Sequence, residues 1–180
     1  IYRQDEILLH RPIFSHLEVQ YLTECISSNF VSSVGKRVVE FENLVADFVG
    51  VKRAVACVNG TSALHMALKA VGVSPGSQVI TQALTFVATS NAISYCGADH
   101  IFIDVDIDSL GMSPLALKSW LDENVTVKSG KSVNKNNGKI ISCCLPMHTF
   151  GLPCRINEIA EICLSHGIPL VEDTAESLGS

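Results

Sequence analysis

Short runs of nearly continuous apolar residues recur along the chain, and between them apolar residues return every three or four positions. A run of the first kind predicts a β-strand that is covered on both faces, and the second spacing predicts an amphipathic helix. The alternation of strand and helix is typical of a mostly parallel sheet with helical crossovers. The predicted strands span residues 54–58, 78–82, 100–105, 139–146 and 168–173.

Two further helices are predicted ahead of the first strand. Ser15 and Glu18 have the spacing of a capping box, and apolar residues follow them at helical intervals. The second helix should begin near Lys36 and end before Gly50, since glycine is common just past a helix C-terminus. The helices that alternate with the strands are predicted at residues 64–71, 86–96, 114–124 and 156–166.

These elements predict an α/β fold in which a mostly parallel sheet has helices on both faces. Residues 1–30 are predicted to form an N-terminal helical segment, and residues 31–180 the domain that contains the sheet. One polar stretch, residues 128–139, is rich in asparagine and lysine and lies between a helix and a strand. Its composition is typical of a mobile surface loop.

The composition narrows the classes of function. Hydrophobic residues make up 47% of the 180 residues and charged residues 17%, which is typical of a globular domain. The formal charge of −5 argues against a nucleic-acid partner, and no apolar run approaches the roughly 20 residues of a membrane helix. Cysteines in apolar runs predict buried thiols in a reducing cytoplasm. Those runs hold Cys57, Cys96, Cys143, Cys144 and Cys163.

Three alternating acids, Asp104, Asp106 and Asp108, resemble the start of a calcium-binding loop. Ser109 stands where that loop requires glycine, and Leu115 stands where it requires glutamate. The acids alternate with apolar residues, as at the end of a half-buried strand. The cysteine spacing likewise fits no zinc module, so we expect no metal site.

In an open α/β sheet, ligands bind beyond the carboxyl ends of the strands. Gly60, Thr61 and Ser62 follow the first predicted strand and open a helix, where hydroxyls and unpaired amides can hold a phosphate; an ordinary capped turn is the alternative. Phe86, after the second strand, could stack on a ring or be a core aromatic. His148, after the fourth, could serve a site or be structural.

The last predicted strand ends in Glu172 and Asp173. An acid at the end of a buried strand is costly unless a basic side chain or a cationic ligand pairs with it. A phosphate cup, a flat aromatic and a buried anion together suit one cofactor, pyridoxal phosphate, whose ring nitrogen must stay protonated. We therefore predict that the buried acid at this strand end pairs with the ring nitrogen of this cofactor.

Six stretches, in order, resemble the DegT/StrS family of sugar aminotransferases, which have the fold of the aspartate aminotransferase superfamily. They span about residues 30 to 180. The resemblance implies that residues 31–180 form the large domain of a pyridoxal phosphate-dependent transferase of fold type I, incomplete and without the C-terminal small domain. The six stretches are VSSVGKRVVEFE, VNGTSALHMAL, TFVATSNAISYCGA, FIDVDIDSLGMSP, the HTFGLP turn and VEDTAESLGS.

The resemblance also implies a role for each candidate residue. The cofactor phosphate would be held by Gly60, Thr61 and Ser62, the ring would stack on Phe86, and the ring nitrogen would pair with Asp173. At position 176, near the ring hydroxyl, the family commonly has glutamine. This chain has Glu176, whose carboxylate is unfavourable beside a phenolate unless a proton lies between them. The residues expected to contact substrate are Ser32, Ser33, Val34, Gly35 and His148.

The activity that the resemblance implies is amination of a nucleotide-linked 4-keto-6-deoxy sugar, with glutamate as amino donor, in the making of a surface polysaccharide or a nonulosonic acid. Such an enzyme would be a cytoplasmic homodimer without a nucleic-acid or membrane partner. Two alternatives stay open. One is a pyridoxal phosphate-dependent sugar dehydratase of the same family, and the other is a non-catalytic protein that binds the cofactor or a sugar.

No lysine of this chain lies in a context that matches the Schiff-base lysine of the family, which comes shortly after the stretch matched by residues 170–180. Catalysis needs that amine as a covalent anchor and as a proton carrier. We therefore expect no catalytic residue within these 180 residues, and we expect the chain to be part of a longer protein.

Overall fold

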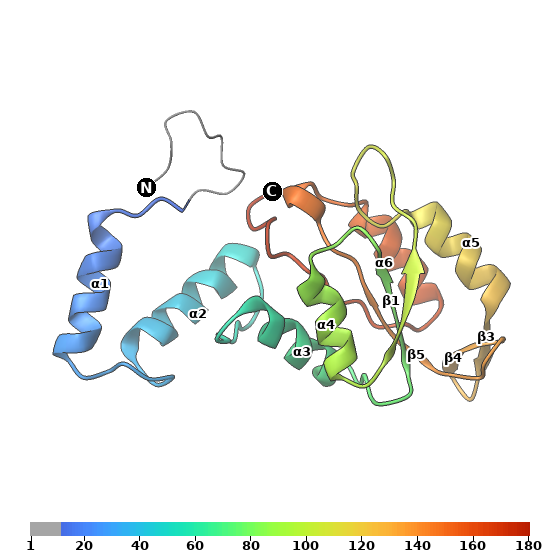
Figure 1. Ribbon diagram of the computed structural model, residues 1–180, viewed down its shortest axis with the longest axis horizontal. Coiled ribbons are helices and arrows are strands. Elements are labelled where there is room, and N and C mark those ends of the chain that lie inside the picture. Colours follow the sequence, from blue (N-terminus) through green and yellow to red (C-terminus); the bar gives the residue numbers. More distant parts are fainter. Residues whose placement is uncertain (1–11) are drawn as a thin grey trace. The chain divides into compact units, whose positions relative to one another are not determined.

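A computed structural model describes residues 12–180, and residues 1–11 lie outside the described range (Figure 1). The chain divides into two compact units, and the division falls between Ala56 and Cys57. The predicted N-terminal segment, residues 1–30, therefore begins outside the described residues. Its boundary with the larger domain stays a prediction.

The first unit holds two helices, α1 (His16–Ser27) and α2 (Lys36–Val49), and both were predicted from the sequence. The capping box of α1 is present: the Ser15 amide donates to the Glu18 carboxylate at 2.6 Å. The helix α2 ends at Gly50, whose φ of 70° is left-handed, as expected for glycine just past a helix.

The apolar side chains of these two helices remain largely exposed. Among the residues of α1 and α2, Ala46 alone is buried. The predicted apolar face of α2 is open to solvent at Phe41, Leu44 and Phe48. The sequence pattern therefore predicted the positions of the helices correctly, but it did not predict what packs against their apolar side chains.

The second unit contains a parallel three-stranded sheet with the order β2-β1-β5. A further segment, residues 168–173, runs beside β5 as two isolated parallel bridges, so the fifth predicted strand is present only as an extended segment. The strands are β1 (Gln78–Gln82), β2 (Asp99–Ile103) and β5 (Ile141–Leu145).

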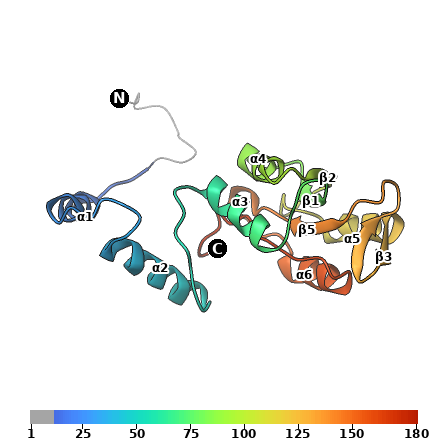
Figure 2. The ribbon, with the colours of Figure 1, turned by 90° about the horizontal axis from the view of Figure 1, so that it is seen from below.

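Helices cover both faces of this sheet, as predicted; Figure 2 shows α4 and α6 on opposite sides of it. One face carries α3 and α4, and the other carries α5 and α6. A short 3₁₀ helix, η1, follows β5. The bounds are α3 (Gly60–Ala70), α4 (Val87–Tyr95), α5 (Pro114–Asn124), α6 (Ile156–Ser165) and η1 (Thr149–Gly151).

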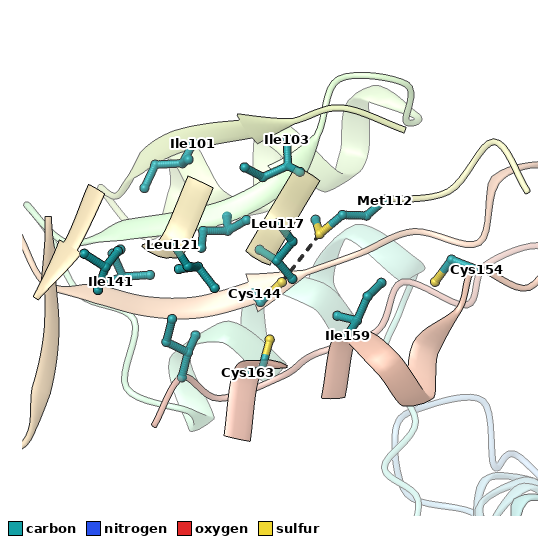
Figure 3. Close-up of a cluster of buried hydrophobic side chains, with 13 residues drawn as sticks. Ile101, Ile103, Met112, Leu117, Leu121, Ile141, Cys144, Cys154, Ile159 and Cys163 are labelled. Carbon is teal, nitrogen blue, oxygen red and sulfur yellow. Dashed lines mark hydrogen bonds between the residues drawn. The ribbon is translucent and has the colours of Figure 1, made fainter. Parts of the chain in front are cut away.

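Neighbouring residues of one strand enter different cores, because side chains alternate across a sheet. In β1, Val79 packs with α3 and α4, whereas Ile80 packs with α5 and α6. In β5, Cys143 and Cys144 divide in the same way. Figure 3 shows the second of these clusters, in which Cys144 lies among the side chains of α5 and α6. A sheet buried on both sides explains why its strands read as continuous apolar runs.

Two predicted features are wrong. Residues 54–58 form no strand in the structure, and Val55, Cys57 and Val58 are exposed. Among the described residues no segment pairs with this stretch, and an extended segment without a hydrogen-bonded neighbour gains little from β geometry. The burial expected for Cys57 fails for the same reason.

Residues 128–139, predicted as a mobile loop, contain half of a β-hairpin. The strands β3 (Val125–Lys128) and β4 (Lys131–Asn134) pair antiparallel. Ser129 and Gly130 between them have φ values of 51° and 74°, and positive φ at both central residues is the mark of a tight hairpin turn. The polar composition led to the wrong prediction of a surface loop because a polar residue, Asn134, is buried here. Its side-chain amide donates to Gln78 at 2.9 Å.

None of the helices within residues 12–180 is long and apolar enough to cross a membrane.

Candidate functional site

The carboxyl end of the sheet is tied together by the buried side chain of Gln82, the last residue of β1. The two hydrogens on its Nε2 are shared among three acceptors, the carbonyl oxygens of Leu84 and Met147, both at 3.1 Å, and Thr149 Oγ1 at 3.0 Å. Its Oε1 accepts from the amides of Met112 at 2.9 Å and Met147 at 3.2 Å. One amide group therefore joins the loops that follow β1, β2 and β5.

Asp173 lies at this same edge, at the end of the segment beside β5, and is 5% exposed. Its Oδ2 accepts from Thr89 Oγ1 at 2.6 Å, and its Oδ1 accepts from the amide of Ala175 at 3.3 Å. The backbone of Asp173 pairs with Pro146 and His148 at 2.9 and 3.2 Å. The carboxylate is thus buried and held by neutral donors.

Phe86 is the residue immediately before α4, and its side chain is 68% exposed, so it is not a core aromatic. The start of α4 is anchored on Met147: its Sδ lies 3.4 Å from the Phe86 amide and 2.9 Å from Thr85 Oγ1. The Phe86 ring is therefore held at the carboxyl edge but stays open to a stacking partner.

The start of α3 is a capped turn, and it also has amides that could hold a phosphate. Asn59 caps the helix: its Oδ1 accepts from the Ser62 amide at 2.9 Å, and its carbonyl accepts from the Ala63 amide at 3.1 Å. Within residues 12–180, the amides of Gly60 and Thr61 have no hydrogen-bond partner. A Cβ at Gly60 would meet no atom within 4 Å. This helix start is open and can accept an anion.

His148 is buried, and both of its ring nitrogens contact protein atoms. Nδ1 accepts from the Cys154 amide at 3.2 Å, and Nε2 lies 3.2 Å from Glu172 Oε2. Because Nδ1 accepts an N–H, the ring proton sits on Nε2 and is donated to Glu172. Burial, together with the charge of Glu172, raises the pKa of the Cys154 thiol to about 11. His148 therefore braces the turn after β5, and its contact with substrate stays a prediction.

The segment around Glu176 lies close against η1. A Cβ added to Gly151, whose φ is 78°, would come within 2.7 Å of the Glu176 carbonyl oxygen. Glycine is thus required for this close approach. The Glu176 side chain is exposed, and its role beside a ring hydroxyl stays a prediction.

The residues expected to contact substrate in the first unit lie between α1 and α2. Gly35 is the N-cap residue of α2, and it lines with Ser32 an apolar hollow of about 710 Å³. Ser33 and Val34 are exposed beside them. Their contact with a sugar stays a prediction.

The acids that resembled a calcium loop serve a structural contact at the same edge of the sheet. Asp106 pairs with Arg155, the residue that precedes α6. Burial acts to raise the pKa of Asp106, but hydrogen bonds from Arg155 and Ser113 outweigh it and hold the pKa below its usual value. The pair fastens the loop after β2 to the second face of the sheet.

Sequence reasoning missed Gln82, Thr85, Thr89 and Met147, which organise this edge. Gln82 had a detectable signal, because a polar residue that ends an apolar strand is buried at the edge where ligands bind. The two threonines are four residues apart across a helix start, a spacing that brings side chains together, but nothing in the sequence pointed to Asp173 as the partner of Thr89.

The arrangement suits a cationic ligand atom. Within residues 12–180, no lysine, arginine or histidine lies within ion-pair distance of the Asp173 carboxylate. A buried carboxylate without a cation is costly, and a protonated ring nitrogen would supply the missing charge. An open helix start and an exposed aromatic ring in the same unit suit the phosphate and the ring of one ligand.

Three comparisons with known proteins identify related sequences and a related structure. Residues 12–180 match the sequence model of the DegT/DnrJ/EryC1/StrS aminotransferase family. The chain is 35% identical over 163 residues to GDP-perosamine synthase from Caulobacter vibrioides, covering 91% of this chain and 40% of that protein. For GDP-perosamine synthase from Escherichia coli O157:H7 the identity is 37% over 174 residues, covering 97% and 43%. The crystal structure of a DegT DnrJ EryC1 StrS aminotransferase from Brucella abortus has a TM-score of 0.77 at 29% identity, covering 91% and 42%.

The fold is therefore that of the pyridoxal phosphate-dependent aminotransferases, as the sequence predicted. The chain spans about two fifths of the length of the curated relatives that it matches.

Proposed function

The chain belongs to the DegT/DnrJ/EryC1/StrS aminotransferase family, and we propose that the protein that carries it binds pyridoxal phosphate and transfers an amino group to a nucleotide-linked sugar. The observation that carries this proposal is Asp173, a buried carboxylate at the carboxyl edge of the sheet that has no cation among the described residues.

When bound, pyridoxal phosphate supplies an electron sink for bond making and breaking at the carbon that carries the amino group. That sink needs a protonated ring nitrogen, and an ionised carboxylate beside the nitrogen favours its protonated form. Asp173 would accept the N–H of the ring in a setting from which water is largely excluded, because the residue is 5% exposed.

The other contacts follow from the first turn of α3 and from α4. The amides of Gly60 and Thr61, with the hydroxyls of Thr61 and Ser62, would hold the phosphate at a helix start. Phe86 would provide a flat apolar surface against one face of the ring. These contacts would fix the orientation of the cofactor relative to Asp173.

The proposed amino acceptor is a nucleotide-linked 4-keto-6-deoxy sugar, and the proposed donor is glutamate. Two relatives are named GDP-perosamine synthase, which supports an amino sugar carried on a nucleotide. Contacts with the sugar are assigned to Ser32, Ser33, Val34, Gly35 and His148. Glu176 is assigned to the neighbourhood of the ring hydroxyl.

We further propose a cytoplasmic homodimer that takes part in polysaccharide biosynthesis. A Bacillus subtilis relative that is 36% identical is named spore coat polysaccharide biosynthesis protein SpsC, which supports the pathway. The exposed apolar residues of α2 support a partner surface, since contiguous apolar faces mark interaction sites. The cysteines of the chain are all free thiols, which favours a reducing compartment.

The test is Asp173→Asn in the protein that carries this chain. The variant should fold, because asparagine has nearly the same shape as aspartate. The rate of amino transfer should decrease by about 100-fold or more, since the ring nitrogen loses its anionic partner. The measurement is the rate of sugar amination with glutamate, with circular dichroism to verify folding. Asp104→Asn, an exposed acid at the end of β2, is the matched control and should keep its rate. A folded Asp173→Asn variant with full activity would refute the assignment.

A further inference from the structure

Two hydroxyl groups in series connect Asp173 to the residues just before α4. Thr89 Oγ1 lies 2.6 Å from Asp173 Oδ2, and Thr85 Oγ1 lies 2.6 Å from Thr89 Oγ1. Thr85 Oγ1 is in turn 2.9 Å from Met147 Sδ. Thr89 is fully buried and Asp173 and Met147 are nearly so, whereas Thr85 is partly exposed. Water therefore has little access to the contact between Thr89 and Asp173.

The number of available hydrogens decides in which direction the hydrogen bonds between these groups are donated. Three contacts join four groups, but each threonine hydroxyl carries a single hydrogen and the thioether carries none. With Asp173 ionised, Thr89 must donate to the carboxylate, because an ionised carboxylate can only accept. The single hydrogen of Thr85 can then go to Thr89 Oγ1 or to Met147 Sδ, and the hydroxyl oxygen is the better acceptor at 2.6 Å because a thioether accepts only weakly. Both hydroxyl hydrogens therefore point toward Asp173.

Such an arrangement directs two hydroxyl hydrogens, one behind the other, toward the Asp173 carboxylate. A hydrogen bond to an ionised acceptor is about twice as strong as one between neutral groups, and a second hydroxyl that donates to the first strengthens it further. The opposite polarity, in which Thr85 donates to Met147 and Thr89 to Thr85, would require a proton on Asp173. The weak sulfur acceptor gives little in exchange, because a thioether is a poor hydrogen-bond acceptor.

The same contacts fix which oxygen of Asp173 is occupied. Oδ2 takes the short hydrogen bond from Thr89, whereas Oδ1 receives only the Ala175 amide at 3.3 Å. A carboxylate oxygen has about two acceptor positions, so Oδ1 keeps capacity for a further donor.

We propose that Thr89 and Thr85 are positioning residues that orient the Asp173 carboxylate so that it can accept the N–H of the cofactor ring. This inference rests on the proposed function, because it takes the ring nitrogen of pyridoxal phosphate as the partner of Asp173. Thr89 acts directly on the carboxylate, and Thr85 acts through Thr89. The start of α4 thereby couples the stacking residue Phe86 and the acid that faces the ring nitrogen.

The experiment compares two ligands in the cofactor-free form of the protein that carries this chain. One is pyridoxal phosphate, and the other is its 1-deaza analogue, in which carbon replaces the ring nitrogen. Dissociation constants are measured by titration calorimetry for the wild type and for Thr89→Val, Thr89→Ser and Thr85→Val. Thr81→Val is the control, because Thr81 is also buried and its Oγ1 donates to the Leu145 carbonyl at 2.8 Å, away from Asp173.

Thr89→Val should weaken pyridoxal phosphate binding by about tenfold, since it removes a hydrogen bond to a charged group. Binding of the deaza analogue should change by less than about twofold, because the analogue has no N–H for Asp173. Thr89→Ser should restore binding. Thr85→Val should weaken binding by about threefold, because the Thr85 hydroxyl acts on Asp173 only through Thr89. Thr81→Val should bind both ligands as the wild type does.

Equal weakening of both ligands by Thr89→Val would overturn the proposal, because it would mean that the threonine only supports the local structure. Unchanged binding of pyridoxal phosphate in a folded Thr89→Val variant would overturn it as well, while leaving the proposed function intact. A wild-type protein that binds neither ligand would overturn the proposed function, and the inference with it.

Discussion

The strand β1 begins and ends with a buried glutamine, and the two have different surroundings. Gln78, at the amino edge of the sheet, has one side-chain partner: its Oε1 accepts from Asn134 of the hairpin at 2.9 Å. Gln82, at the carboxyl edge, has five polar contacts to three loops. The same residue type therefore fastens a turn at one edge and organises several loops at the other.

Glycines repeat this contrast. Gly138 and Gly151 both have left-handed backbone, with φ values of 73° and 78°. At the amino edge, Gly138 has no atom within 4 Å of an added Cβ, whereas at the carboxyl edge the Glu176 carbonyl oxygen would lie 2.7 Å away from one on Gly151. Close backbone packing and a saturated polar network coincide at the edge that holds Asp173. A site needs fixed geometry, and this edge supplies it.

The largest effect that separates the two edges is expected from the glutamines. Gln82→Leu should lower the free energy of unfolding by about 4 kcal/mol, because each buried polar group left without a partner costs about 1–3 kcal/mol. Gln78→Leu should cost only about 1 kcal/mol, since a single side-chain contact is lost. Chemical denaturation of the protein that carries this chain measures both values.

Hydrogen exchange sharpens the comparison further. The amides of Met112 and Met147 donate to Gln82 Oε1, so their exchange should accelerate in Gln82→Leu and stay unchanged in Gln78→Leu. Equal losses of stability in the two variants, with no change at these amides, would show that Gln82 is not the organising residue of this edge.

A smaller effect is expected from the glycine pair. Both Gly151→Ala and Gly138→Ala place a Cβ on left-handed backbone, at a cost of about 1–2 kcal/mol. Gly151→Ala should lose about 2 kcal/mol more, because its Cβ would overlap a backbone oxygen that cannot move without shifting the segment around Glu176. Thermal unfolding curves of the two variants provide the measurement. If the two variants were equally destabilised, the close packing at the carboxyl edge would not contribute to the free energy of unfolding.

Much of the scaffold could be predicted because its signals are local. The strand at residues 78–82 and the helix at residues 114–124 have the predicted bounds, since continuous apolar runs and a Ser-Pro cap identify such elements directly. The burial of Asp173 could be predicted as well, because the residue ends a continuous apolar run.

The failures concern information that lies outside the local sequence. Residues 54–58 have the composition of a strand, but a strand forms only with a neighbour, and the described chain gives them none. Residues 131–134 form a strand by pairing with residues 125–128, and the burial of Asn134 depends on a hydrogen bond to a glutamine 56 positions away along the chain. The contact of Thr89 with Asp173 is likewise long-range, so no pattern of spacing could have predicted it.

The most direct test of the central claim is a crystal structure of the protein that carries this chain with pyridoxal phosphate bound. The account predicts that the ring nitrogen lies within about 3 Å of an Asp173 carboxylate oxygen and that the phosphate is hydrogen-bonded at the first turn of α3, to Thr61 or Ser62. A cofactor bound elsewhere, with its ring nitrogen away from Asp173 and the start of α3 packed against other protein, would contradict it.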